Sequence, residues 1–120
     1  MATAKKRLLS GSTDGRMILV TATASAGTTI HTAVAGTTAG TVDEIWLYAI
    51  NHHTANLKLT IEFGGTTSPN DTIVVWVPYD SGLFLVVPGM ILQNGSVVRA
   101  FTTTTGSQVS IGGWVNTITD

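Results

Sequence analysis

The sequence predicts an all-β fold, a single-domain β-sandwich of jelly-roll type with about eight antiparallel strands. Threonine occupies 21 of the 120 positions and valine is also abundant, and β-branched side chains of this kind favour a pleated strand over a helix. Turn signals made of Gly, Pro, Asn and Asp recur at short, regular intervals, as expected when many short strands are joined by tight turns. The length is that of one domain.

Each strand is predicted where an apolar or alternating run lies between two turn signals. Gly64-Gly65, Pro88-Gly89 and Asn94-Gly95 are three such signals. The predicted strands are residues 16–22, 28–34, 42–51, 56–63, 71–77, 83–87, 96–102 and 108–118. Within the last of them, Gly112-Gly113 predicts a bulge or a close approach of two backbones.

The N-terminal segment holds half of the basic side chains, three of six, at Lys5, Lys6 and Arg7. Because it has no strong hydrophobic period, residues 1–15 are predicted to form a flexible basic arm, and residues 16–120 the sandwich domain. The arm is either a solvated flexible tail or a segment that becomes ordered only on an acidic partner surface, and both interpretations stay open here. The net charge of −1 argues against nucleic acid as the partner, since phosphate binding needs a basic face.

The strand predicted at 42–51 is apolar on both faces. One face carries Ile45, Leu47 and Ala49, and the opposite face carries Trp46, Tyr48 and Ile50. The next strand, 56–63, is expected to have one wet face formed by Lys58, Thr60 and Glu62. A two-layer sandwich buries only one face of each sheet, so the second apolar face of 42–51 needs a cover.

Another copy of the chain is the expected cover, because a domain of this size has few loop residues to spare and large exposed apolar patches are unusual on monomers. Strands 71–77 and 83–87 repeat the pattern with Trp76 and Phe84. We therefore expect a closed homo-oligomer, with a homotrimer as the first assignment. The candidate subunit-interface residues are Trp46, Tyr48, Ile50, Trp76 and Phe84.

Ionisable chemistry is scarce, since 11% of the residues are charged and there is no Cys. Asp43 and Glu44 are neighbours on a strand, so their side chains point to opposite faces and cannot act as a catalytic pair. His31 is expected to be a partly exposed strand residue, and His52 and His53 a polar turn that would bind a metal only with help from symmetry mates. The chain is therefore predicted to be no enzyme, with no catalytic, metal-binding or cofactor-binding residues.

Membrane insertion is not expected either. The longest uninterrupted apolar runs, such as residues 83–87, have about five residues, whereas a membrane helix needs roughly 20.

The C-terminal half resembles small virion proteins of tailed bacteriophages, over roughly residues 42–118. The segments that carry the resemblance are Ser81 to Gly89, then Asn94 to Phe101 with its Val-Val-Arg-Ala strand, and the Gly-Trp-Val sequence at 113–115. Capsid decoration, or cement, proteins are the most similar members. The pattern includes no catalytic signature.

The resemblance implies a structural protein that binds between subunits of a capsid as a homo-oligomer. Its partners would be itself and the major capsid protein, with Lys5, Lys6 and Arg7 as candidate capsid contacts, on the capsid surface of a virion assembled in the host cytoplasm. A tail, baseplate or receptor-binding module that binds carbohydrate is the alternative. A small hydrolase is a weaker one, since it would need an acid and a base drawn from three His and seven carboxylates.

Overall fold

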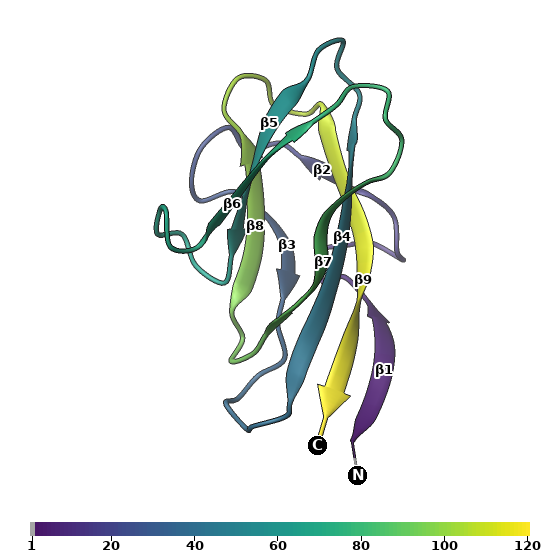
Figure 1. Ribbon diagram of the computed structural model, residues 1–120, viewed down its shortest axis with the longest axis vertical. Coiled ribbons are helices and arrows are strands. Elements are labelled where there is room, and N and C mark those ends of the chain that lie inside the picture. Colours follow the sequence, from purple (N-terminus) through teal and green to yellow (C-terminus); the bar gives the residue numbers. More distant parts are fainter. Residues whose placement is uncertain (1) are drawn as a thin grey trace.

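The computed structural model describes residues 2–120 and contains nine strands and no helix in that range. The strands are β1 (Thr3–Leu8), β2 (Ile18–Val20), β3 (Thr28–Thr32), β4 (Val42–Asn51), β5 (Leu57–Phe63), β6 (Thr72–Val77), β7 (Phe84–Leu92), β8 (Val97–Thr102) and β9 (Val109–Thr119). They form two antiparallel sheets that face each other, which confirms the all-β sandwich (Figure 1). Each of the eight predicted strands overlaps one of β2 to β9.

The order of the strands is that of a jelly roll. Sheet A has the order β1-β9-β4-β7, with β2 also paired to β9, and sheet B has the order β3-β8-β5-β6. Four of these pairs, β2 with β9, β3 with β8, β4 with β7 and β5 with β6, are the rungs of one long hairpin. The β4–β9 and β5–β8 pairs then roll that hairpin into two sheets.

The first strand departs from the prediction. Residues 3–8, expected within a flexible arm, pair with the C-terminal half of β9, beside which β1 runs in Figure 1. All six side chains of β1 are exposed, so the strand has no buried face and no hydrophobic period by which the sequence could reveal it. The sandwich core also begins earlier than residue 16, because Leu9 is buried.

Strand β7 is also longer than predicted, because it continues through Pro88 and Gly89 to Leu92. Proline is tolerated here because β7 is an edge strand, and the pairing with β4 shifts register at two points around this segment. The Pro-Gly pair therefore marks irregular pairing rather than the end of a strand.

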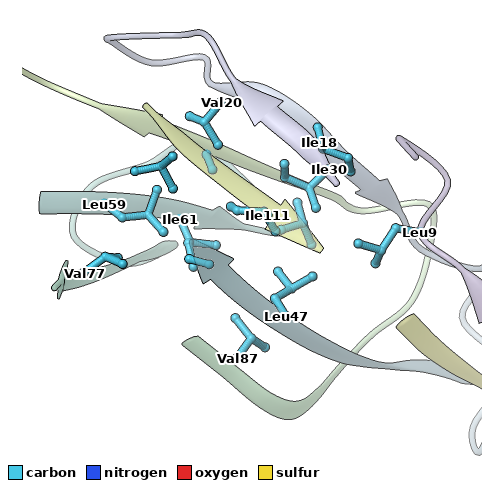
Figure 2. Packing of buried hydrophobic residues seen from close by; sticks show 14 of the residues in the cluster. Leu9, Ile18, Val20, Ile30, Leu47, Leu59, Ile61, Val77, Val87 and Ile111 are labelled. Carbon is cyan, nitrogen blue, oxygen red and sulfur yellow. The ribbon is translucent and has the colours of Figure 1, made fainter. Parts of the chain in front are cut away.

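The core lies between the inner faces of the two sheets. Leu47 of β4 and Ile111 of β9 meet Leu59 and Ile61 of β5 in the close view of Figure 2. Each of these side chains is fully or almost fully buried, and burial of one such side chain contributes about 1.5–3 kcal/mol. The alternation predicted for β4 is therefore correct, with Ile45, Leu47 and Ala49 inside.

Candidate functional site

Several large apolar side chains that do not belong to the core lie on the outer face of sheet A. Trp46 and Tyr48 alternate with the buried residues of β4 and point outward. The register pairs Trp46 with Trp114 of β9, and Trp114 with Leu8 of β1. Three strands from distant parts of the sequence thus place their large apolar side chains in one row.

The aromatic rings in this row stack on one another. The ring centroids of Trp46 and Trp114 are 5.9 Å apart with an interplanar angle of 15°, and those of Tyr48 and Trp114 are 5.9 Å apart at 29°. On its other side, the indole of Trp46 lies over Gly89, where an added Cβ would come within 2.8 Å of the ring. Stacking of this kind contributes about 0.5–1.5 kcal/mol per pair, so the rings form an ordered platform.

More exposed apolar side chains extend the platform at its edges. Leu85 and Ile91 of β7 pair with Tyr48 and Glu44 of β4 and lie on the same face. Leu8 is 57% exposed and Ile91 58% exposed. We call this surface the aromatic face, and its members are Leu8, Trp46, Tyr48, Leu85, Ile91 and Trp114.

One cation and one anion lie on the aromatic face. The ammonium group of Lys6 is 5.2 Å from the ring centroid of Trp114, a cation–π arrangement. The Glu44 carboxylate accepts hydrogen bonds from Trp46 Nε1 at 3.0 Å and from Asn116 Nδ2 at 2.9 Å. These two hydrogen bonds, that of Trp46 first, lower the pKa of Glu44 below its usual value of 4.5. The charges are thus tied to the platform and add no net charge to it.

The three basic residues of the N-terminal segment do not share one face, because they alternate along β1. Lys6 lies over the aromatic face, whereas Lys5 and Arg7 pair with Thr117 and Val115, whose side chains point inward. An open hollow of about 670 Å³ is lined by Lys6, Arg7, Leu8, Ser10, His31, Thr32, Val34, Asp43 and Thr117. Lys5 and Arg7 are the two cations on the side of β1 that points away from the aromatic face.

His31 is buried at 4% exposure, so the expectation of a partly exposed strand residue is wrong. Its Nδ1 accepts the backbone N–H of Ser10 at 3.0 Å, which leaves Nε2 to donate to Asp43 Oδ2 at 2.7 Å. Asp43 also accepts from the hydroxyl of Thr117 at 2.8 Å and from the backbone N–H of Val34 at 3.1 Å. The sequence could not show this pair, because it joins different sheets through the core.

The chemistry that this buried pair can perform is limited by its hydrogen bonds. Both ring nitrogens of His31 already have partners, and the hydroxyl oxygen of Ser10 accepts the N–H of Thr32 at 2.7 Å. A nucleophilic site needs a hydroxyl held on the imidazole nitrogen that takes its proton. No such contact occurs within residues 2–120, and the arrangement instead satisfies buried polar groups.

The remaining interface candidates lie outside the stack of aromatic rings. Ile50 points outward on the same side of β4 as Trp46 and Tyr48, and it pairs with Ser110 of β9, which pairs with Leu19 of β2. Phe84 packs against the core of the sandwich. Trp76 is exposed on β6 in sheet B, on the opposite outer side of the molecule. Sequence alternation could not separate these residues, because it does not reveal which sheet a strand joins.

The outer side of β5 is less exposed to solvent than expected, because Thr60 and Glu62 are buried. The loop between β2 and β3 covers Glu62, whose carboxylate accepts hydrogen bonds from the hydroxyl of Ser25 at 2.5 Å and the backbone N–H of Gly27 at 2.7 Å. Lys58 is the member of this row that stays exposed.

His52 is exposed and His53 is half-buried in the turn after β4. Among residues 2–120, no three His, Cys, Asp or Glu side chains are grouped closely enough to hold a metal ion. No helix in the described chain is long and apolar enough to cross a membrane.

Comparison of the chain with protein-family models, with curated proteins and with solved structures finds no match.

Proposed function

We propose that this protein is a non-enzymatic structural protein that associates with copies of itself through the aromatic face. The observation that carries the proposal is the stacked platform of Trp46, Tyr48 and Trp114 with its exposed apolar edges. Aromatic residues are enriched at protein interfaces, and Trp and Tyr are over-represented among the residues that dominate binding energy. The platform also has ordered geometry before any partner arrives, which lowers the entropy cost of binding.

A second copy of the chain is the occupant that fits this face best. The face carries one cation, Lys6, and one anion, Glu44, so it neither attracts nor repels a strongly charged partner. A second copy supplies another aromatic face, and its Glu44 and Lys6 can lie opposite the Lys6 and Glu44 of the first copy. We retain the homotrimer as the proposed assembly.

The biological setting that we propose is the capsid surface of a tailed bacteriophage, assembled in the host cytoplasm. It rests on the resemblance of residues 42–118 to small virion proteins, and the jelly-roll order of the strands is compatible with it. The protein would bind between capsid subunits and stabilise their contacts, and several copies in one oligomer would add up many weak contacts. Attachment to a tail or baseplate is the alternative location.

Lys5 and Arg7 are the proposed contacts to the major capsid protein. They lie together on the side of β1 away from the aromatic face, so an oligomer formed through that face leaves them available. Acidic groups of a capsid protein would be attracted to them. Lys6, the third candidate, is instead assigned to the subunit interface because it lies over Trp114.

The test compares particles that lack the protein with the same particles after adding it back. We expect imaging to show added density at fixed positions between capsid subunits, and the Lys5→Glu/Arg7→Glu double variant to bind at least about tenfold more weakly because like charges repel. Lys58→Glu, which reverses one exposed positive charge on sheet B, serves as the control for charge reversal elsewhere on the surface and should bind normally.

Two results would contradict the proposal. One is density on the tail alone, which would support the alternative location. The other is equal binding by the double variant and wild type, which would exclude Lys5 and Arg7 as capsid contacts. Both variants should give the unfolding curve of the wild type, because these side chains are exposed.

A further inference from the structure

The outer face of sheet B has one conspicuous feature, the exposed side chain of Trp76. It is 61% exposed, although Trp side chains are highly buried on average. Trp76 pairs with Lys58 of β5, and Val74, two residues earlier on the same side of β6, is 52% exposed. An indole ring is thus presented to solvent next to an ammonium group.

A hollow of about 240 Å³ lies on the same face, and its lining includes Lys58 and Val74 but not Trp76. Trp76 lies beside the hollow, because it pairs with Lys58 and follows Val74 by two residues on β6. Phe101 adds a second apolar surface, and Glu62 and six Ser and Thr residues complete the lining. Thr66 and Ser68 are exposed, so their hydroxyls are accessible to a ligand. Each can donate one hydrogen bond and accept two.

We infer that Trp76 and this hollow form a binding site for a pyranose sugar. A pyranose ring has an apolar face of C–H groups and an edge of hydroxyls. The indole offers a flat apolar surface with negative charge on its face, which suits the C–H groups. The Ser and Thr hydroxyls can exchange hydrogen bonds with the sugar edge, and Lys58 can donate to a sugar oxygen.

The composition of this face favours a glycan over a protein partner. Lys and Ser are depleted at protein interfaces, and both line this hollow. The aromatic face on sheet A has the opposite composition, with two Trp and one Tyr in contact. The buried carboxylate of Glu62 is occupied by Ser25 and Gly27, so it holds the adjacent loop in place and leaves the exposed hydroxyls to the ligand.

The inference does not depend on the proposed assembly, because sheet B is not part of the aromatic face. Loss of one function by substitution should therefore leave the other intact.

The test is a glycan array with the full chain, followed by titration with methyl glucoside, methyl galactoside and methyl glucuronide. The readout is the NMR signal of the Trp76 indole N–H, identified by its absence from Trp76→Phe. We expect at least one of these sugars to shift that signal, and Trp76→Ala to bind at least about tenfold more weakly. Trp76→Phe should keep part of the affinity, because it retains an aromatic face.

Leu83→Ala is the matched control, since Leu83 is 63% exposed but lies outside β6 and outside the lining of the hollow, and it should bind as wild type does. The inference is overturned if no glycan on the array binds, or if Trp76→Ala binds as tightly as wild type. It is also overturned if Trp76→Ala dissociates an oligomer, because Trp76 would then be a subunit contact.

Discussion

The outer faces of sheet A and sheet B are built by the same rule but carry different side chains. In both, every second residue of a strand points away from the core. On sheet A these residues are Trp46, Tyr48 and Trp114, which stack on one another. On sheet B a single exposed indole, that of Trp76, pairs with Lys58 and lies on the same side of β6 as Val74.

The neighbours of an aromatic residue therefore determine which kind of partner it can bind. Trp46 belongs to a continuous apolar row that crosses three strands, which matches the composition of a protein interface core. Trp76 is a single exposed indole beside Lys58, which suits the sugar ring proposed as its ligand. The two tryptophans are alike in sequence, since each lies in a strand with apolar neighbours.

The largest effect is expected where the inward and outward sides of β4 are compared directly. Leu47→Asp places a carboxylate in the fully buried core and should remove most of the stability, which for native proteins totals about 5–15 kcal/mol. Trp46→Asp, one residue away on the outer face, should leave a folded chain. Circular dichroism and urea unfolding would measure the stability of both variants. An equal loss of stability in the two would contradict the assignment of Leu47 to the core and of Trp46 to the outer face.

A second comparison uses the adjacent carboxylates of β4, of which Asp43 points inward and Glu44 outward. Asp43→Ala leaves His31 Nε2–H, the Thr117 hydroxyl and the Val34 N–H without their acceptor. The free energy of unfolding should fall by at least about 3 kcal/mol, because each buried donor left without an acceptor costs about 1–3 kcal/mol. Glu44→Ala is the control and should cost far less, because Glu44 is only half-buried and water can replace its hydrogen bonds. A similar loss of unfolding free energy in both variants would show that the three hydrogen bonds to Asp43 do not stabilise the core.

A third prediction concerns the buried carboxylate of sheet B. Glu62→Ala removes the acceptor for Ser25 and for the N–H of Gly27, and should lower the free energy of unfolding by about 1–3 kcal/mol. Hydrogen exchange at Gly27 should become faster at the same time. Unchanged exchange would mean that Glu62 does not hold the loop between β2 and β3.

The smallest effect is a dependence of stability on pH at the aromatic face. The pKa of Glu44 is lowered in the folded chain from 4.5 by the hydrogen bonds from Trp46 and Asn116. Its stabilising contribution is therefore fully present above 4.5 and is lost as the pH falls through the lower, folded-state pKa. Wild type should lose more stability than Glu44→Gln between neutral pH and about pH 3. Identical pH profiles in urea unfolding would contradict this role.

Most of the fold could be predicted from the sequence, because each of β2 to β9 is an apolar or alternating run between turn signals. Gly113 also behaves as predicted, since an added Cβ would collide with the carbonyl oxygen of Trp46 on β4. Strand β1 was missed because it pairs through its backbone and buries no side chain. Pro88-Gly89 was misinterpreted because an edge strand tolerates it.

The candidate site was predicted in part. Alternation correctly placed Trp46, Tyr48 and Ile50 on one outward face. It could not add Leu8 and Trp114 to that row, since their positions depend on the register of β1 and β9 with each other and with β4. It also grouped Trp76 with these residues, because only the pairing of β6 with β5 assigns Trp76 to the other sheet.

The aromatic face is proposed to hold copies of the chain together. The molar mass of the protein in solution is the most direct test of this association. Light scattering at micromolar concentration should give about three times the chain mass of 12.5 kDa for wild type. Trp46→Asp should give the mass of one folded chain, and Trp76→Asp the wild-type mass. A wild-type mass of one chain would contradict self-association. Dissociation by Trp76→Asp but not by Trp46→Asp would show that the aromatic face is not the subunit interface.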